Sequence, residues 1–238
     1  MSTEDRKVAI VTGGSQGIGA GIVQGYRHNE WAVVATSRTI TRSADPGVLT
    51  VAGDLSDPAT ANQIVGAAVR TFGRIDTLIN NAGIYLSKPF TDYTAADYAA
   101  VVGVNLTGFF HLTQLAIGHM LERGTGHVVN ITATLVDVAD SSAPSALTAL
   151  TKGGLAAATR SLAIEYASRG IRVNAVSPGI IQTPVHPPQS YTALGSQLSP
   201  VGHVGQVSDI VAAILFLESS SFVTGEILHV DGGQIAGH

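Results

Sequence analysis

Seven short apolar runs recur along the chain, separated by longer segments in which apolar residues return every three or four positions. Nearly every position in the seven runs is β-branched or otherwise apolar, which is typical of strands covered on both faces. We predict strands at residues 8–12, 32–36, 48–52, 77–80, 127–131, 172–176 and 226–230.

The segments between these runs have the spacing of helices. Residues 58–72 are an example, with Asp57 as the expected N-cap and Pro58 directly after it. Strand and helix in strict alternation predict parallel strands joined by right-handed crossovers. The expected fold class is therefore α/β, a single-domain, Rossmann-like, doubly wound parallel sheet of seven strands. Ligands of such sheets bind beyond the carboxyl ends of the strands.

The first predicted strand runs directly into a glycine-rich turn, in the stretch VAIVTGGSQGIGAGI. Glycines let the backbone turn sharply and approach a pyrophosphate, which then meets the free N–H groups of the following helix. The spacing TGxxxGxG is one residue longer than the common GxGxxG. In this strand-turn-helix setting it predicts a dinucleotide site.

The end of the second predicted strand indicates which dinucleotide is bound. An NAD site places a carboxylate there for the ribose 2′-hydroxyl, whereas a 2′-phosphate is matched by arginine. This chain has Ser37 at that position, followed by Arg38. We expect NADP(H), with NAD(H) as the alternative in which Arg38 is an ordinary surface charge.

Composition narrows the class of protein. The chain has 238 residues, of which 45% are apolar and 13% charged, and no shift in composition divides it, so residues 1–238 are expected to form one domain. A net charge of −4 with scattered arginines argues against nucleic acid as a partner. No uninterrupted apolar run approaches the roughly 18 residues of a membrane span, and the polar start is unlike a signal peptide. No membrane partner and a cytoplasmic location are expected.

Two further classes of site find no support. The sequence has no cysteine, which excludes disulfides, thiolate metal sites and a cysteine nucleophile. Its eight histidines show no ligand spacing, so no metal is expected.

Several motifs, spaced along the chain, together resemble those of a known protein family. TGGSQGIG at 12–19, DLSD at 54–57, NNAG at 80–83, Asn105, Lys152, IRVNAVSPG at 171–179 and TGEILHVDGG at 224–233 resemble a short-chain dehydrogenase/reductase over nearly the whole chain. The resemblance implies that Asp54 and Leu55 border the adenine. It also implies that residues 81–83 lie along the cofactor and that 178–183 hold its nicotinamide end. Together with the glycine turn and the second strand end, it gives a cofactor site of Gly13, Ser15, Gln16, Gly17, Ile18, Gly19, Ser37, Arg38, Asp54, Leu55, Asn81, Ala82, Gly83, Lys152, Pro178, Gly179, Ile181 and Thr183.

The catalytic residues depart from that family's pattern. Its members usually carry Asn, Ser, Tyr and Lys, with the last two spaced YxxxK on one face of a helix. Here SALTALTKGG puts Thr148 at the tyrosine position. The serine position falls on Ala133, and Thr134 follows it. An aliphatic hydroxyl donates hydrogen bonds but is a poor general base, so Thr148 is not a simple replacement.

Lys152 and Asn105 complete the expected catalytic set. Lys152 is one of three lysines and lies in a run, residues 143–159, with no other charge, where a buried lysine needs a partner. We expect it to bind the nicotinamide ribose, the alternative being an ammonium that reaches water and binds nothing. Asn105 matches the asparagine that holds a water near that lysine in the family, or else it bonds a nearby carbonyl.

These residues leave three functions open. The first is an NADP(H)-dependent reductase of a small, largely uncharged carbonyl or alcohol, with protons arriving through water, Lys152 and Asn105 or another pocket residue. The second is a reductase whose hydride acceptor is an imine or an enone. A strong acid beside the atom that accepts the hydride is then less important. The third is a catalytically silent sensor or scaffold that keeps the cofactor. We expect an enzyme. Other candidate proton carriers by position are Tyr85, Asp137, Ser145, His186 and Tyr191.

The last expectations concern a lid and assembly. Residues 180–206 are rich in proline, bounded by glycines and nearly uncharged, which is typical of a segment that covers a substrate. The helix expected at 145–169 and the segment 105–121 are apolar on more than one face, as helices buried against another chain are. The resemblance implies a homodimer or homotetramer built on these two helices.

Overall fold

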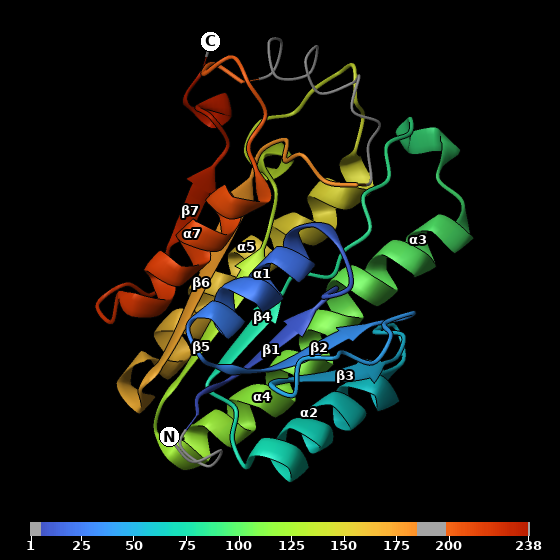
Figure 1. Cartoon of the computed structure of the whole chain (residues 1–238). Coiled ribbons are helices and arrows are strands. Elements are labelled where there is room, and N and C mark those ends of the chain that lie inside the picture. The colour runs from blue at the N-terminus through green and yellow to red at the C-terminus, as the bar shows by residue number, and fades with distance from the viewer. Residues whose placement is uncertain (1–5, 185–198, 238) are drawn as a thin grey trace.

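A seven-stranded, fully parallel sheet forms the centre of the protein (Figure 1). The computed structural model describes residues 6–184 and 199–237. The strands are β1 (Val8–Thr12), β2 (Ala32–Ser37), β3 (Val48–Ala52), β4 (Thr77–Asn80), β5 (Gly126–Ile131), β6 (Ile171–Pro178) and β7 (Ile227–Val230). Their order is β3-β2-β1-β4-β5-β6-β7, so the chain changes direction across the sheet after β3. The α/β class, the parallel pairing and all seven strand positions are confirmed.

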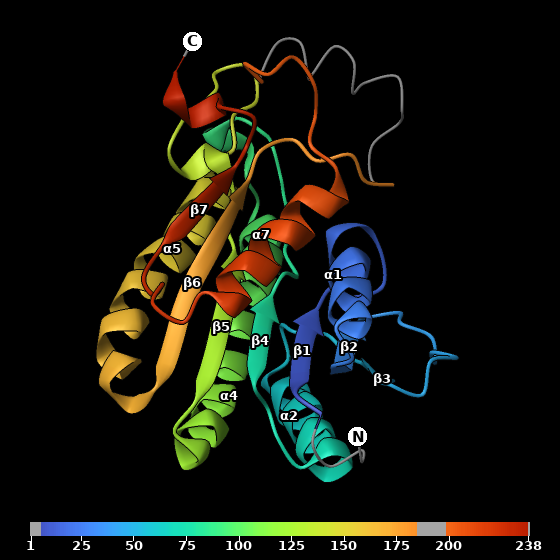
Figure 2. The same cartoon turned by 60° about the vertical axis from the view of Figure 1, so that its left-hand side comes forward.

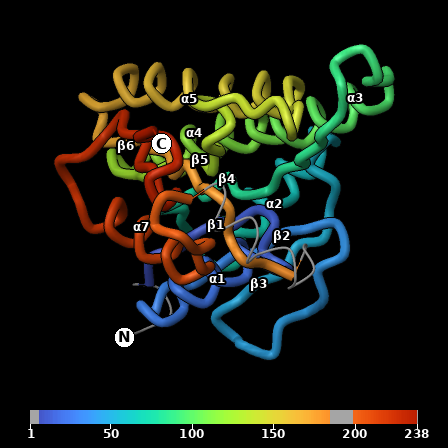
Figure 3. The backbone as a smooth tube through the Cα atoms, turned by 90° about the horizontal axis from the view of Figure 1, so that it is seen from above, coloured from blue at the N-terminus to red at the C-terminus, as the bar shows by residue number. Residues whose placement is uncertain are grey.

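Helices cover both faces of the sheet, as the view along it shows (Figure 3). One face packs on α2 (Pro58–Phe72), α4 (Phe109–Arg123) and α5 (Ala146–Tyr166). The other face packs on α1 (Gly17–His28) and α7 (Val207–Ser219). Since each strand is buried on both sides, its sequence is apolar at almost every position rather than alternating.

One part of the predicted pattern is wrong. Strict alternation requires a helix between β2 and β3, but residues 38–47 are a loop. Their sequence, RTITRSADPG, has no apolar face to pack against the sheet, and it ends in Pro-Gly. The loop is instead bound to α1, because Arg27 donates two hydrogen bonds to Asp45 at 2.8 and 3.1 Å.

Helix ends follow local chemistry where the sequence supplies a cap. Asp57 accepts a hydrogen bond from the amide of Ala59, and Gly73 ends α2 in a left-handed conformation, so the boundaries expected for this helix are confirmed. The helix expected at 145–169 is shorter, because α5 ends at Tyr166 and a 3₁₀ turn, Ala167–Arg169, follows.

A second long helix bears on the expectation about membranes. α3 (Ala95–Val102), a π-helical turn (Gly103–Gly108) and α4 form one continuous helix, Ala95–Arg123. It is long and apolar enough to span a membrane by length and composition, although the sequence has no uninterrupted apolar run. Since 44% of its most apolar window is buried in this protein, it has the character of a core helix.

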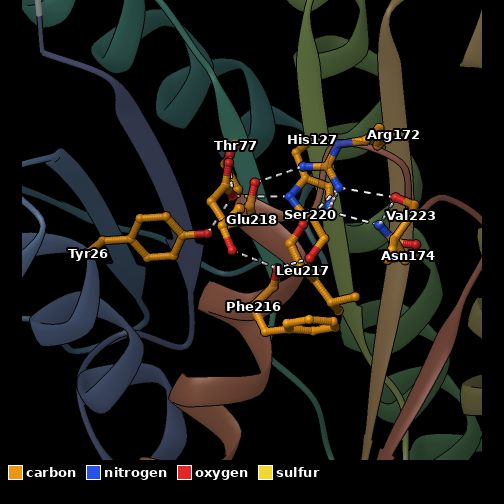
Figure 4. Close-up of polar contacts among 11 residues, drawn as sticks. Tyr26, Thr77, His127, Arg172, Asn174, Phe216, Leu217, Glu218, Ser220 and Val223 are labelled. Atoms are coloured by element: carbon orange, nitrogen blue, oxygen red, sulfur yellow. Dashed lines mark hydrogen bonds and ion pairs between the residues drawn. The ribbon is translucent and has the colours of Figure 1, made fainter.

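A buried polar network ties the helices to the amino ends of three strands (Figure 4). Glu218, at the end of α7, accepts hydrogen bonds from the Tyr26 hydroxyl at 2.8 Å and the Thr77 hydroxyl at 2.9 Å. Its carboxylate also lies 3.0 Å from Nδ1 of His127. The three partners come from α1, β4 and β5, so one carboxylate joins elements far apart in the sequence. Figure 2 shows α7 crossing the strands on the side of α1.

The hydrogen bonds around His127 define its tautomer. The amide of Glu226 donates to Oδ1 of Asn174, so Nδ2 of Asn174 is the group that donates to Nε2 of His127, at 3.1 Å. Nε2 therefore accepts, and Nδ1 carries the proton donated to Glu218. Burial is the main cause that lowers the pKa of His127, against the attraction of Glu218. Burial alone would raise the pKa of Glu218, but its hydrogen bonds with His127, Tyr26 and Thr77 lower it.

We expect the network to make the fold sensitive to acid. Both groups bind protons more readily in the unfolded chain, so the free energy of unfolding should fall as pH drops through 6.5, the ordinary pKa of histidine, and again below 4.5. Glu218→Gln should lower that free energy by about 2 kcal/mol at pH 7, because charged hydrogen bonds are lost. Urea unfolding from pH 4 to 8 measures both effects. Glu122→Gln, whose side chain is 76% exposed, is the control; equal stability of the two variants would contradict the prediction.

Candidate functional site

A cleft of about 440 Å³ opens at the carboxyl ends of the strands, where the sheet order reverses between β1 and β4. This is the place where open α/β sheets bind ligands. Most of its lining comes from the ends of β1 to β4 and the segments after them, and Thr183 comes from the segment after β6: Gly13, Ser15, Gln16, Gly17, Ile18, Gly19, Ser37, Arg38, Thr39, Gly53, Asp54, Leu55, Asn81, Ala82, Gly83, Ile84, Val104 and Thr183.

The glycine turn after β1 is held in a conformation that side chains resist. Gly13 and Gly17 have φ of +67° and +54°. A β-carbon on Gly19 would lie only 2.0 Å from the carbonyl oxygen of Gly13. Asn81 supports the turn from β4, since its Nδ2 donates to the carbonyl of Thr12 at 2.8 Å. The turn thus leads its backbone directly into the amino end of α1.

The end of β2 presents a cation and no acid to the cleft. Arg38 is exposed there, and Oγ of Ser37 is buried with no hydrogen-bond partner among the described residues. The nearest carboxylate, Asp54 at the end of β3, accepts from the amide and hydroxyl of Ser56 at 2.9 and 2.8 Å. These bonds are the main cause that lowers its pKa, with Arg38 adding a smaller effect.

Lys152 is buried beside this cleft. Only 7% of it is exposed, and its Nζ donates to the carbonyl of Ile131 at 2.6 Å. The alternative of an ammonium that reaches water without a partner is therefore wrong. A β-carbon on Gly83 would lie 3.0 Å from Nζ, which places the ammonium against a residue of the cleft wall. Burial lowers the pKa of Lys152 to about 8.

Asn105 lies in the π-helical turn Gly103–Gly108, a local geometry that is frequent at functional sites. Its Oδ1 accepts from the amide of Ile84 at 2.8 Å, and its Nδ2 donates to the carbonyl of Ile84 at 3.0 Å. Nδ2 also donates to the hydroxyl of Thr151 at 3.0 Å. The bond to a nearby carbonyl, one of the two roles considered for Asn105, is present, and it fixes the backbone after β4.

The two threonines at the catalytic positions are buried and already bonded. Thr148 is 2% exposed, and its hydroxyl accepts from the amide of Leu86 at 3.1 Å and donates to the carbonyl of Leu86 at 3.3 Å. The hydroxyl of Thr134 donates to Oε1 of Gln234 at 3.2 Å. Neither residue lines the cofactor cleft.

Most residues predicted for the cofactor line the cleft together, and four do not. Lys152, Pro178, Gly179 and Ile181 are absent from the lining; Ile181 is buried in the core, where it pairs with Gly205. Thr39, Gly53, Ile84 and Val104 line the cleft without having been predicted. Thr39, Gly53 and Ile84 are direct neighbours of motif residues, a signal that could have found them, whereas Val104 comes from the π-helical turn.

The remaining candidates are spread over the carboxyl end of the sheet. The hydroxyl of Tyr85 lies 3.1 Å from that of Ser145, and Asp137 pairs with His229 at 3.2 Å. His186 and Tyr191 lie outside the described residues, as does most of the expected lid. Within residues 6–184 and 199–237, no three histidine or acidic side chains gather as metal ligands would.

Comparison with known proteins gives consistent matches. The protein-family model described as enoyl-(acyl carrier protein) reductase matches residues 13–234. L-fucose dehydrogenase of Bos taurus is 34% identical, over 98% of this chain and 90% of its own. The structure of ElxO with NADP bound has a TM-score of 0.90 at 30% identity, covering 98% of this chain and all of that one. A 3-ketoacyl-(acyl-carrier-protein) reductase from Brucella melitensis complexed with NADH has a TM-score of 0.88 at 31% identity, with the same coverage.

The glycine turn offers a direct test of the cleft. Gly19→Ala should abolish dinucleotide binding, because the new methyl group would meet the Gly13 carbonyl at 2.0 Å. Gly118→Ala is the matched control: it is exposed on α4 with nothing within 4 Å, and should raise the free energy of unfolding by about 1 kcal/mol. Fluorescence titration with NADPH and urea unfolding of both variants check this. Retained binding in Gly19→Ala would show that the cleft is not the dinucleotide site.

Proposed function

Because this chain belongs to the short-chain dehydrogenase/reductase family, we propose that it is an NADP(H)-dependent oxidoreductase acting on a small, largely uncharged carbonyl or alcohol. Family membership places it among the nicotinamide-dependent dehydrogenases and reductases. The preference for NADP(H), the substrate class and a proton path without the usual tyrosine are our proposals. The observation that carries the proposal of an enzyme is the buried ammonium of Lys152 against the wall of the cleft. The preference for NADP(H) rests on Ser37 and Arg38.

The cleft fits a nicotinamide dinucleotide. The turn from Gly13 to Gly19 would hold the pyrophosphate at the amino end of α1, and Asp54 with Leu55 would border the adenine. A 2′-phosphate would find Arg38 and the unpartnered hydroxyl of Ser37. When bound, the cofactor supplies or accepts the hydride. Solved relatives hold NADP in one case and NADH in another, so the choice for this chain rests on Ser37 and Arg38.

Lys152 provides the positive charge of the proposed site. One of its three N–H groups is bonded to Ile131, which leaves two for the ribose hydroxyls or a water. In a site of low polarity this charge stabilises negative charge that develops on a substrate oxygen. A pKa of about 8 keeps the ammonium protonated at neutral pH. Asn105 supports the site by fixing Ile84, the residue after Gly83.

A second substrate class follows from the missing tyrosine. An iminium that accepts a hydride on carbon becomes a neutral amine, and an activated alkene becomes an enolate whose charged oxygen is remote from the carbon that received the hydride. A strong acid beside the accepting carbon is therefore less necessary. The bonded hydroxyl of Thr148 and the methyl group of Ala133 favour such a substrate. The description of the matching family model as an enoyl reductase names an activated alkene.

The third candidate is a protein that binds the cofactor without turnover. Its support is the loss of both the tyrosine and the serine at Thr148 and Ala133. The burial of Lys152 argues against this candidate. Burying a charged group is unfavourable, and a protein without turnover has less need of a charge in that place.

We expect Ser37 and Arg38 to set the cofactor preference. Ser37→Asp should weaken NADPH binding at least about tenfold, equivalent to about 1.4 kcal/mol, because a carboxylate repels the 2′-phosphate, and NADH binding should be retained. Isothermal titration calorimetry with both cofactors measures this. Arg42→Ala, on the same loop but outside the cleft lining, is the control and should bind as the unmodified chain does. Tighter binding of NADH than NADPH by the unmodified chain would reverse the proposal.

Turnover distinguishes the three functions. NADPH oxidation should be followed with ethyl acetoacetate, 2,3-butanedione, benzaldehyde, 1-pyrroline and 2-cyclohexenone. We expect activity in the unmodified protein, a loss of about 100-fold in Lys152→Met, and a decline as pH rises through about 8, where the ammonium loses its proton.

Each other outcome selects an alternative. Activity with 1-pyrroline or 2-cyclohexenone alone identifies the second class of substrate. NADPH binding with no turnover by the unmodified chain, and turnover appearing in Thr148→Tyr, identifies the silent protein.

A further inference from the structure

The segment after β4 is fastened to the start of α5 by an unusual set of bonds. Thr148 holds both backbone groups of Leu86, and the Tyr93 hydroxyl donates to the same carbonyl at 3.0 Å. Farther along, the amide of Lys88 and the hydroxyl of Ser87 donate to the carbonyl of Pro144 at 2.9 and 3.0 Å. Thr148 therefore works as a clamp on this segment, and its hydroxyl is not free for a substrate.

Tyr85 lies between two fixed points of that segment. Ile84, on one side, lines the cofactor cleft and is held by Asn105 through both of its backbone groups. Leu86, on the other side, is held by Thr148. A side chain between two such anchors has a backbone fixed in position, one residue away from the cleft.

The phenol of Tyr85 reaches the amino end of α5. Its hydroxyl lies 3.1 Å from Oγ of Ser145, the N-cap residue of α5, three positions before Thr148. Oγ of Ser145 donates to the carbonyl of Ala143 at 2.6 Å. Since a serine hydroxyl has one proton, the Tyr85 hydroxyl is the donor in the pair. Tyr85 is 55% exposed, so its hydroxyl is accessible to a substrate.

We propose that Tyr85 supplies the acidic hydroxyl of the active site and that Thr148 positions its backbone. Ser145 accepts the phenolic hydrogen bond before substrate binds; a bound substrate oxygen replaces Ser145 as the acceptor and then takes the proton. This inference rests on the proposed function with a carbonyl substrate. A phenol is a much stronger acid than an aliphatic hydroxyl, so Tyr85 is better suited to the step than Ser145 or Thr148.

The step balances in both directions. In reduction the carbonyl carbon receives a hydride, the C=O π bond becomes an O–H bond, and the proton comes from Tyr85, which is left as a phenolate. Water then returns a proton to the exposed phenolate. In oxidation the phenolate takes the alcohol proton as the C–H bond gives up its hydride.

Tyr85→Phe tests this with Tyr98→Phe as the matched control. Tyr98 lies on α3 and is also 55% exposed. With the carbonyl of the panel that the unmodified chain reduces fastest, we expect kcat to fall about 100-fold in Tyr85→Phe and to stay unchanged in Tyr98→Phe. The Kd for NADPH should be unchanged in both, because neither residue lines the cofactor cleft.

Binding without turnover gives an independent readout. Ethyl acetoacetate added to the protein with NADP⁺ cannot be reduced, so its Kd, measured by calorimetry, reports the hydrogen bond to the substrate oxygen. We expect Tyr85→Phe to weaken this binding several-fold, up to about tenfold. Ser145→Ala, which leaves the phenol in place, should lower kcat less than Tyr85→Phe does.

The outcomes separate this inference from the proposed function. Absence of turnover by the unmodified chain with every carbonyl overturns both. Turnover that persists at full kcat in Tyr85→Phe, with ketone binding unchanged, overturns the role of Tyr85 and leaves the reductase intact. A loss confined to Tyr85→Phe supports the role.

Discussion

The constraint on which this structure depends is that parallel strands cannot be joined by hairpins, so the connection between two strands has to cross over one face of the sheet. β1 to β3 extend the sheet in one direction, and β4 to β7 extend it in the other. The connections after β1 and β4 therefore leave the sheet on opposite faces, and no helix fills the space between them. The cleft is the consequence, and the predicted cofactor residues that line it come from the carboxyl ends of strands, the segments after them and the first turn of α1.

Polar groups are buried at both ends of this sheet, with different consequences. At the amino ends, the carboxylate of Glu218 is satisfied by Tyr26, Thr77 and His127, and the network serves to hold α7 and α1 on the strands (Figure 4). At the carboxyl ends, Lys152 has one protein partner and Ser37 has none among the described residues. A fully satisfied network stabilises a fold, whereas an unsatisfied group beside a cleft is suited to a ligand. The network that stabilises the fold and the groups suited to a ligand thus lie at opposite ends of the strands.

With threonine in place of the family's tyrosine at position 148, the hydroxyl at this position bonds the protein backbone. A threonine is too short to reach a substrate from that site, but its hydroxyl can serve a nearby backbone, and it holds Leu86 at both polar groups. Asn105 does the same for Ile84. The segment after β4 is consequently held at two successive points, Ile84 and Leu86. This is the physical setting in which an exposed phenol on that segment can take a defined position.

The sequence by itself determined the class of fold, all seven strands and the glycine turn, because buried strands are continuously apolar and a tight turn needs glycine at positive φ. It also indicated most of the cleft, since its residues follow strand ends directly. Tertiary structure alone decided that 38–47 form a loop bound to Arg27, that Val104 joins the cleft, and that Lys152 meets Ile131 rather than water. It also decided that the hydroxyl of Thr148 bonds the backbone of Leu86, whereas the hydroxyl of Tyr85 lies beside that of Ser145. Those contacts join residues 18 to 62 positions apart, a separation at which no local pattern of residue types specifies a partner.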